Sequence, residues 1–207
     1  AGTCSEVEDI KKLVVEGLNK GALAVGFGLD YTPAASHWEI IEMFRIAAEH
    51  RASCHVHLRG RGQKGSRNAI EALGEVIAAS AITGASLHVV HINSTGMGGV
   101  PQLLEMIEGA RNNGIDVTTE CYPYTAGMTR LESTLFDEGW QEQYGIDYDS
   151  LQWPATGEFL TSQTFAQYRE SGGWVITHAT PAMAVTAAVK SPLTMIATDS
   201  IIQEGRG

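Results

Sequence analysis

The sequence predicts an α/β fold built on a parallel sheet. Short apolar, β-prone runs alternate with amphipathic helical runs along most of the 207 residues, as in repeated strand–helix units. Six strands are predicted, and their runs are apolar throughout rather than alternating, which suits parallel strands covered on both faces. Such strands fit either a doubly wound sheet or a (β/α) barrel. In both folds, functional side chains gather at the carboxyl ends of the strands.

In the first half of the chain, helices and strands are predicted from the spacing of apolar residues and from the capping residues at helix ends. Glycine commonly follows the last helical residue, and Gly21 and Gly84 stand at two such ends. Ser36 and Glu39 have the spacing of a capping box at a helix start. Helices are predicted over 7–21, 36–50 and 68–84, and strands over 22–27 and 52–59.

The second half continues the alternation around one irregular stretch. Strands are predicted over 85–92, 115–122, 174–178 and 193–199, and helices over 99–114, 161–173 and 181–190. Between residues 125 and 160 the period is lost, and aromatic residues are scattered through a long mixed segment. The glycine-rich run 94–99, STGMGG, lacks the lysine and spacing of a phosphate-binding loop. We expect it to be a loop that turns over the mouth of the barrel.

Composition narrows the class of protein. The net charge of −10 argues against a nucleic-acid backbone or an anionic membrane surface as partner. No apolar run is long enough to span a bilayer, and no basic segment followed by an apolar one opens the chain. The 3 cysteines include no CxxC pair, so a disulfide framework is not expected. The expected setting is the reducing cytoplasm, with a small-molecule substrate as partner.

Chemically active side chains recur at the ends of the predicted strands. In chain order they are Tyr31, His55, His57, Arg59, His91, Asn93, Glu120, Tyr122, His178 and Asp199. His57, His91 and Asp199 occupy the same place in successive units. Imidazole nitrogens and a carboxylate that meet at one mouth suit a divalent metal such as zinc. Such a metal acidifies water and polarises a carbonyl, and the carboxylate can carry the proton.

Other candidate groups have simpler interpretations. His37 and His50 lie at helix termini, where a solvated imidazole is common. His88 is an odd number of residues from His91, which predicts that it faces the opposite side of the strand. Cys121 has no histidine near it in sequence, so we expect it to pack rather than to act as a nucleophile.

Five segments together resemble the N-acyl-D-amino-acid deacylases, the D-aminoacylase branch of the amidohydrolase superfamily. The segments are GALAVGFGLDYTP, HLRGRG, HVVHINSTG, ECYPYTAGMT and MIATDS, spread from about residue 20 to about residue 205. The resemblance implies a TIM-like (β/α) barrel with one or two zinc ions that hydrolyses the amide of an N-acyl-D-amino acid. It implies that His57, His91 and Asp199 bind metal and that Asp199 is also the general acid/base. Tyr31 and Tyr122 match tyrosines that contact the substrate.

Two further positions are carried over as substrate-binding. Arg59 matches an arginine beside a metal ligand. Asn93 stands where the family has a lysine, and an asparagine can only hydrogen-bond to a substrate carboxylate. Substrate preference is therefore expected to differ. His55 and His178 are additional metal-ligand candidates.

The family's first-strand HxH pair and second-strand cysteine have no counterpart in the 207 residues. The six predicted strands then correspond to strands three to eight of the barrel. We therefore expect residues 1–207 to be one partial amidohydrolase barrel domain of a longer enzyme. The isolated chain is expected to be inactive or very weak, and exposed barrel edges would favour self-association.

Other functions remain open. A sibling amidohydrolase of the dihydroorotase or hydantoinase type would share the metal and the barrel, although Tyr31, Tyr122 and the YPY motif favour a deacylase. A non-catalytic barrel fragment could bind a small molecule or a partner chain. A doubly wound cofactor-binding protein would need a phosphate-binding fingerprint, which the sequence lacks.

Overall fold

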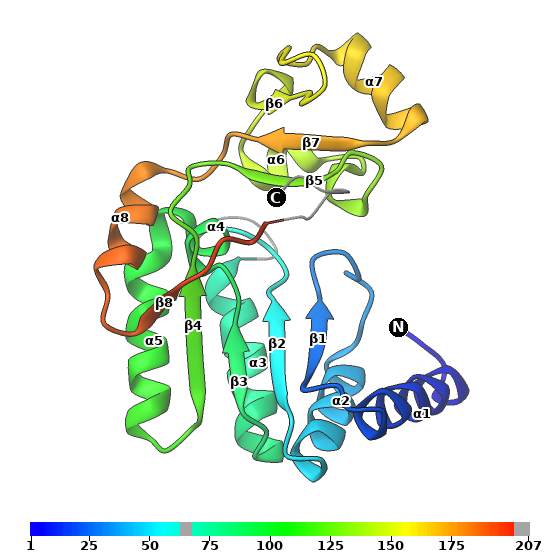
Figure 1. The fold of residues 1–207 in the computed structure, drawn as a ribbon, viewed down its shortest axis with the longest axis vertical. Helices are drawn as coiled ribbons and strands as arrows, with labels where there is room; N and C mark the ends of the chain where they lie inside the picture. Colours follow the sequence, from blue (N-terminus) through cyan, green and yellow to red (C-terminus); the bar gives the residue numbers. More distant parts are fainter. Residues whose placement is uncertain (63–67, 201–207) are drawn as a thin grey trace.

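The structure is a computed structural model that describes residues 1–62 and 68–200. Its larger part is built on a five-stranded sheet. Its order is β1-β2-β3-β4-β8, and every neighbouring pair is parallel. The strands are β1 (Ala24–Gly28), β2 (Ser53–His57), β3 (Leu87–Val89), β4 (Val117–Cys121) and β8 (Thr194–Ile196). The predicted α/β fold with a parallel sheet is confirmed, and all five carboxyl ends reach one edge (Figure 1). β1 and β8 are the two outer strands of this sheet.

Helices precede or connect the parallel strands and supply much of the main core. They are α1 (Cys4–Asn19), α2 (His37–Glu49), α3 (Ala69–Thr83), α5 (Val100–Asn112) and α8 (Ala182–Lys190). Ser36 and Glu39 form the expected capping box, and Gly84 ends α3 in the left-handed conformation at φ 76°. Phe44, Leu73 and Leu103 pack from three of these helices into one core with the strands. Among the described residues, no helix combines the length and apolarity needed to cross a bilayer.

The two faces of the parallel sheet differ. In the view of Figure 1, α2, α3 and α5 lie behind the sheet, and the opposite face is left open by them. Along β2, Cys54 and Val56 are fully buried toward the helices, whereas His55 between them is exposed. The prediction that strands are apolar throughout and covered on both faces was therefore wrong for β2. Its alternate residues form a polar ladder, which leads to His57 at the carboxyl end.

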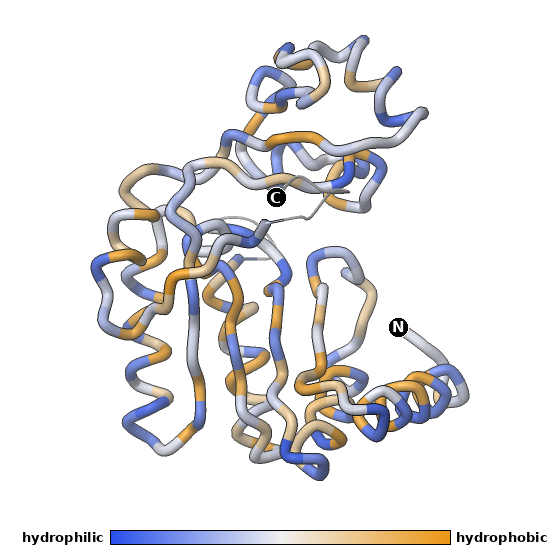
Figure 2. The backbone as a smooth tube through the Cα atoms, in the orientation of Figure 1, coloured by the Kyte–Doolittle hydropathy of each residue, from blue (hydrophilic) through white to orange (hydrophobic). Residues whose placement is uncertain are grey.

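A second, smaller sheet lies above the carboxyl edge of the first (Figure 1). It has the order β5-β7-β6 and is antiparallel, with β5 (Gly127–Arg130), β6 (Leu151–Gln152) and β7 (Trp174–Thr177). Hydrophobic residues mark β7 in Figure 2. The prediction that 174–178 is a strand of the parallel sheet was wrong: the run is apolar and β-prone, but it pairs antiparallel with β5 and β6.

The small sheet has its own hydrophobic core. Trp140, Phe136 and Phe165 meet there with Leu131, Leu151 and Val175. The helical elements around this core are α6 (Trp140–Tyr144), α7 (Ser162–Ser171) and the 3₁₀ turns η2 (Thr134–Phe136) and η3 (Tyr148–Ser150). The irregular stretch of the sequence is thus an ordered lobe with its own core, and we call residues 127–177 the small lobe.

The glycine-rich run after β3 is helical rather than a loop. It forms α4 (Ile92–Gly96) and the 3₁₀ turn η1 (Met97–Gly99). A Cβ atom at Gly96 would lie 2.8 Å from a methyl of Val100 and 2.9 Å from one of Leu103. The glycine is therefore needed for close packing against α5. This corrects the expected loop: the run is a packed turn directly behind the strand end that carries His91.

Candidate functional site

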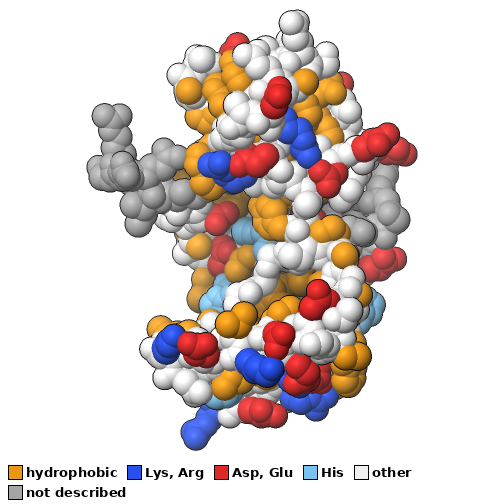
Figure 3. All heavy atoms as spheres, turned by 90° about the vertical axis from the view of Figure 1, so that its right-hand side faces the viewer, with side chains coloured by type: hydrophobic (Ala, Val, Ile, Leu, Met, Phe, Trp, Pro, Cys, Tyr) orange, Lys and Arg blue, Asp and Glu red, His pale blue; other side chains and the backbone are white. Residues whose placement is uncertain are grey.

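A cavity of about 380 Å³ lies between the carboxyl edge of the parallel sheet and the small lobe. Figure 3 shows the molecule hollowed between its two parts, with histidine side chains visible in the hollow. The wall toward the parallel sheet includes Tyr31, His57, Arg61, His91, Ser94, Tyr122 and Asp199. The wall toward the small lobe includes Met128, Thr129, Arg130, Ser133, Trp174 and Thr177. Both modules therefore enclose one space, and Tyr31 hydroxyl bonds across it to Thr129 at 3.0 Å.

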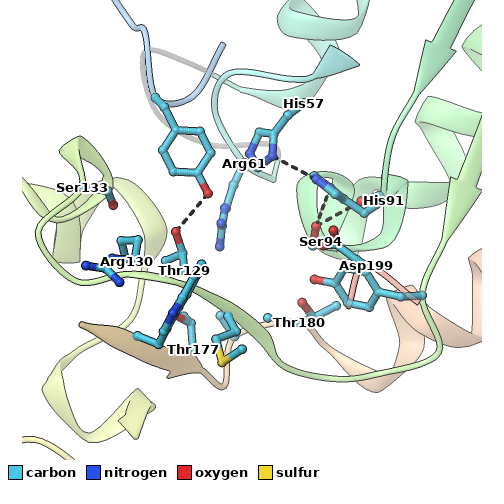
Figure 4. Close-up of a pocket in the computed structure, with 16 residues that line it drawn as sticks. His57, Arg61, His91, Ser94, Thr129, Arg130, Ser133, Thr177, Thr180 and Asp199 are labelled. Carbon is cyan, nitrogen blue, oxygen red and sulfur yellow. Dashed lines mark hydrogen bonds between the residues drawn. The ribbon is translucent and has the colours of Figure 1, made fainter. Parts of the chain in front are cut away.

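His57 and His91 meet at the sheet side of this cavity (Figure 4). His57 is the last residue of β2, and His91 follows β3. The Nδ1 atom of His57 and the Nε2 atom of His91 are 2.9 Å apart. The sequence prediction that these two side chains share a site agrees with this placement. Their roles remain proposals.

The second ring nitrogen of each histidine faces another polar group. His57 Nε2 lies 3.9 Å from the Oδ2 atom of Asp30, whose side chain is 3% exposed. His91 Nδ1 lies 3.0 Å from the Ser94 hydroxyl. Burial, followed by repulsion from His57, lowers the pKa of His91 to about 3. His91 is therefore a neutral imidazole at neutral pH, with a lone pair on one ring nitrogen.

The backbone at His91 explains why the predicted orientation of His88 was wrong. His91 has a left-handed conformation, with φ 34° and ψ 56°, so the strand alternation stops before it. His88 pairs in register with His55, and their ring centroids are 4.7 Å apart on the face that carries His57. His88 is thus on the same side of the sheet as the site, one layer below it, where Nδ1 bonds the Thr118 hydroxyl at 2.8 Å. His55 faces Ser53 at 3.0 Å and does not line the cavity.

Two carboxylates border the histidine pair. Asp199 lines the cavity from the segment after β8 and has a left-handed backbone, φ 50°. Burial raises the pKa of Asp199, and the nearby charge of His57 opposes this in part. Glu120, near the end of β4, accepts a hydrogen bond from the backbone N–H of His91. Burial raises the pKa of Glu120 as well. A carboxyl group with a raised pKa is suited to hold and release a proton near neutral pH.

Three predicted site residues point elsewhere. Arg59 donates to the carbonyls of Pro33 and Ala35 and pairs with Glu75 at 3.0 Å. Asn93 is fully buried, and its amide bonds both the carbonyl and the N–H of Tyr122. His178 bonds Gln152 at 2.9 Å beyond β7 of the small lobe. These three side chains do not line the cavity. Arg59 and Asn93 instead hold neighbouring segments of the site in place, through hydrogen bonds to backbone groups and, for Arg59, through its pair with Glu75.

Cys121, the other candidate for chemistry, is fully buried at the end of β4. Burial raises the pKa of its thiol. This agrees with the expectation that it packs.

Three groups of the site were not predicted from the sequence. Asp30 is buried beside His57, and its Oδ1 atom accepts a bond from the N–H of Gly60 at 3.0 Å. Burial raises the pKa of Asp30, but the neighbouring His57 ring, the hydrogen bond from the N–H of Gly60 and the charge of Arg61 outweigh it, and the net shift is downward. Arg61 extends into the cavity (Figure 4). Ser94 lies three residues after His91. In a helix this spacing places the two side chains side by side, so predicting residues 92–96 as helical would have identified Ser94.

The arrangement fits a metal in its donor types and orientation. The two facing ring nitrogens lie 2.9 Å apart and can point to one ion. Their outer nitrogens are backed by a carboxylate and a hydroxyl, the support usual for metal-ligating histidines. Within residues 1–62 and 68–200, no set of three His, Cys, Asp and Glu side chains is already gathered at ligand distance. The described residues thus offer an open pair of imidazoles, with Asp199 on the same cavity.

Two curated proteins are similar to this chain in sequence. The D-aminoacylase of Alcaligenes xylosoxydans xylosoxydans is 29% identical over 137 residues, which is 64% of this chain and 27% of that protein. The N-acyl-D-glutamate deacylase of the same organism is 29% identical over 135 residues, 62% of this chain and 27% of that protein. The chain resembles the N-acyl-D-amino-acid deacylases. It spans about a quarter of the length of these curated relatives. No family model matches the chain.

Solved deacylase structures share the fold. The N-acyl-D-glutamate deacylase of Bordetella bronchiseptica, solved with zinc and a phosphonate inhibitor, superimposes with a TM-score of 0.77 at 24% identity. It is matched over 96% of this chain and 43% of its own. A D-aminoacylase studied for its binuclear metal centre gives a TM-score of 0.74 at 21% identity, over 94% of this chain and 42% of its own. The α/β fold is thus that of part of a deacylase, small lobe included.

Proposed function

We propose that this chain carries the substrate cavity of an amidohydrolase that cleaves the amide of N-acyl-D-amino acids, as part of a longer protein. The observation that carries the proposal is the convergence of His57 Nδ1 and His91 Nε2 at 2.9 Å on the cavity that Asp199 lines. The similarity to D-aminoacylase and N-acyl-D-glutamate deacylase supports the substrate class.

Zinc, as one or two ions, is the metal proposed for this site, with His57, His91 and Asp199 as its holders. The chemistry it supplies when bound is polarisation of a carbonyl and acidification of water, so that attack is possible near neutral pH. Neutral His91 keeps a lone pair available for it. His55 and His178 lie outside the cavity and are not part of the proposed set.

Asp199 is proposed to move the proton in the reaction. In its ionised form it accepts a proton from the attacking water, and it then delivers that proton to the nitrogen of the leaving amine. The raised pKa of Asp199 supports this exchange. Tyr122, which is 4% exposed, and Tyr31, which is bonded to Thr129, hold the substrate from the sheet side of the cavity. Closure by the small lobe keeps bulk water from the reacting amide.

Arg61 is proposed to bind the α-carboxylate of the substrate. Among the described residues, two arginines line the cavity, and Arg130 is already paired with Glu132 at 2.6 Å. Within the described residues, Arg61 has no carboxylate partner within ion-pair distance, and its guanidinium lies 5.0 Å from the ring centre of Tyr144. A guanidinium in this state can form two parallel hydrogen bonds to a carboxylate. Arg61 would then supply the positive charge that the family obtains from a lysine, at the position where this sequence has Asn93.

Replacing Arg61 with alanine is expected to lower kcat/KM for N-acyl-D-amino acids by about 10- to 100-fold, because a hydrogen bond to a charged group contributes roughly 1.5–3 kcal/mol. The same variant should hydrolyse the corresponding primary amides, which lack the carboxylate, as well as the wild type does. Steady-state kinetics on both substrates measure the difference. Arg111→Ala, at the far end of α5, is the matched control. Equal losses on acid and amide would refute a carboxylate contact.

The function itself is tested by zinc-dependent hydrolysis of a panel of N-acetyl-D-amino acids and their L enantiomers, in a protein that contains this sequence. The D compounds should be cleaved, and chelation should abolish cleavage. Turnover of hydantoins or dihydropyrimidines with no D-acyl activity would contradict the proposal and favour the sibling hydrolase. We expect the 207-residue chain alone to be weak or inactive, because its described residues bring no three His, Cys, Asp or Glu side chains together at ligand distance. Substantial zinc-dependent turnover by the chain alone would show that expectation to be wrong.

Self-association is a further part of the proposal. β1 and β8 are the outer strands of the parallel sheet, and Met195 and Ile196 of β8 are 52% and 60% exposed. An unpaired edge with exposed apolar side chains invites pairing with another strand. Sedimentation at increasing concentration measures whether the chain associates with itself.

A further inference from the structure

Four polar groups form a continuous line through the histidine pair. Asp30 Oδ2 lies 3.9 Å from His57 Nε2, His57 Nδ1 lies 2.9 Å from His91 Nε2, and His91 Nδ1 lies 3.0 Å from the Ser94 hydroxyl. Asp30 Oδ2 is buried and has no hydrogen-bond partner within the described residues. The other oxygen of the same carboxylate is held by the N–H of Gly60 at 3.0 Å. The carboxylate is thus fixed on one side and presents its free oxygen to the ring of His57.

The two ends of this line have different chemistry, and this decides which ring nitrogens carry the protons. A carboxylate can only accept. It therefore favours a proton on His57 Nε2. If Nε2 were unprotonated, its lone pair would be repelled by the buried, negatively charged oxygen of Asp30. A hydroxyl can donate or accept. Ser94 has both options, since its hydroxyl also reaches the carbonyl of His91 at 3.1 Å.

We propose that Asp30 is a positioning residue that fixes His57 in the tautomer protonated at Nε2, which leaves the Nδ1 lone pair directed at the metal position. Ser94 is the adaptable end of the line. Without metal, His91 carries its proton on Nε2 and donates it to His57 Nδ1. To present Nε2 to a metal, His91 must carry the proton on Nδ1, and the Ser94 hydroxyl then accepts it by rotating toward the carbonyl of His91. The proton count of the pair is unchanged by this exchange.

The use of the lone pair for zinc rests on the proposed function, but the tautomer does not. It is measured in the metal-free chain without substrate, by long-range ¹H–¹⁵N correlation spectra of ¹⁵N-histidine-labelled protein at a pH where His57 is neutral. The wild type should show protonated Nε2 and unprotonated Nδ1 for His57. The resonances are assigned by their loss in His57→Gln. A wild-type spectrum with the proton on Nδ1 would overturn the proposal, whatever any variant does.

The variant Asp30→Asn reverses the expected result. Its amide oxygen can keep the bond from Gly60, so its NH₂ group then faces His57 Nε2. A donor that faces a donor drives the ring to the Nδ1-protonated tautomer and blocks the lone pair. Zinc affinity, measured by competition with a chromophoric chelator, should fall by about 10- to 100-fold, the usual effect of losing an outer partner of a metal ligand.

Asp116→Asn is the matched control, because Asp116 is exposed and its carboxylate accepts a hydrogen bond only from Ser86 among the described residues. It should leave both the tautomer and the zinc affinity unchanged. An unchanged tautomer in folded Asp30→Asn would refute the role of Asp30. Failure of the proposed function has a different signature: the wild type would show the expected tautomer and bind zinc, yet a protein that contains the sequence would not cleave N-acyl-D-amino acids.

Discussion

Replacing Asp199 with asparagine is expected to lower kcat for N-acyl-D-amino acids by about 10²- to 10⁴-fold, the range ascribed to a positioned general acid or base. An asparagine occupies the same volume but cannot take up a proton from water or deliver one to the leaving amine. The backbone should tolerate the change, because asparagine is among the residues that adopt the left-handed region, in which residue 199 has φ 50°. Pre-steady-state and steady-state rates on the zinc-loaded protein give the measurement.

The control for this variant is the exposed Asp116 at the opposite edge of the sheet, where Asp116→Asn should leave kcat within about twofold, as distant surface substitutions usually do. Circular dichroism should be the same for both variants. Near-normal kcat in Asp199→Asn with zinc bound would exclude Asp199 as the proton carrier. Glu120, whose pKa is also raised by burial, would then be the next carboxyl group to test.

Replacing Trp140 with alanine is expected to destabilise the small lobe by about 3–5 kcal/mol, as large-to-small changes of buried aromatic residues do. The indole is 4% exposed. It stacks on Phe165 with ring centroids 5.5 Å apart and meets Phe136 edge-on at 5.5 Å. Because the lobe has its own core, the loss should fall on residues 127–177 and largely spare the parallel sheet. Amide hydrogen exchange resolves the two regions.

Trp38→Ala is the matched control, since Trp38 on α2 is 62% exposed. It should change the free energy of unfolding by less than about 0.5 kcal/mol. In Trp140→Ala, exchange should quicken in β5 and β7 and remain slow in β2 and β3. Equal acceleration in both sheets would show that the two cores unfold as one unit, and the description of a separate lobe would then be wrong.

Most of the fold could be predicted because its signals are local. Alternating helix and strand periods, the capping box at Ser36 and the glycine at 84 all appear within a few residues of the elements that they define. The partner of 174–178 could not be predicted, since an apolar β-prone run is the same whether it pairs parallel or antiparallel. The structure of the aromatic stretch before it could not be predicted for a related reason. Its core forms between residues up to 44 positions apart in sequence, as Leu131 and Val175 show.

The histidine pair could be predicted because parallel strand ends meet at one edge, which holds for His57 and His91 whatever the details. The inward or outward direction of single residues was less predictable. Strand alternation gave the wrong side for His88, because the left-handed residue at 91 breaks the count. Asp30 and Arg61 were missed since both follow strand ends by two or more residues. There the direction of a side chain depends on the turn and not on the strand.

The wall of the cavity that carries the histidines and the wall opposite it belong to two regions, each with its own hydrophobic core. Under the proposed function, the groups that act on the amide therefore all belong to the sheet region, whereas the small lobe contributes only to the surface around the substrate. A lineage could exchange or redesign residues 127–177 and inherit the reaction intact, acquiring a new acyl or side-chain preference at little risk to the chemistry. Grafting experiments that aim to broaden substrate range have a natural boundary here, at the two segments that join the lobe to β4 and α8.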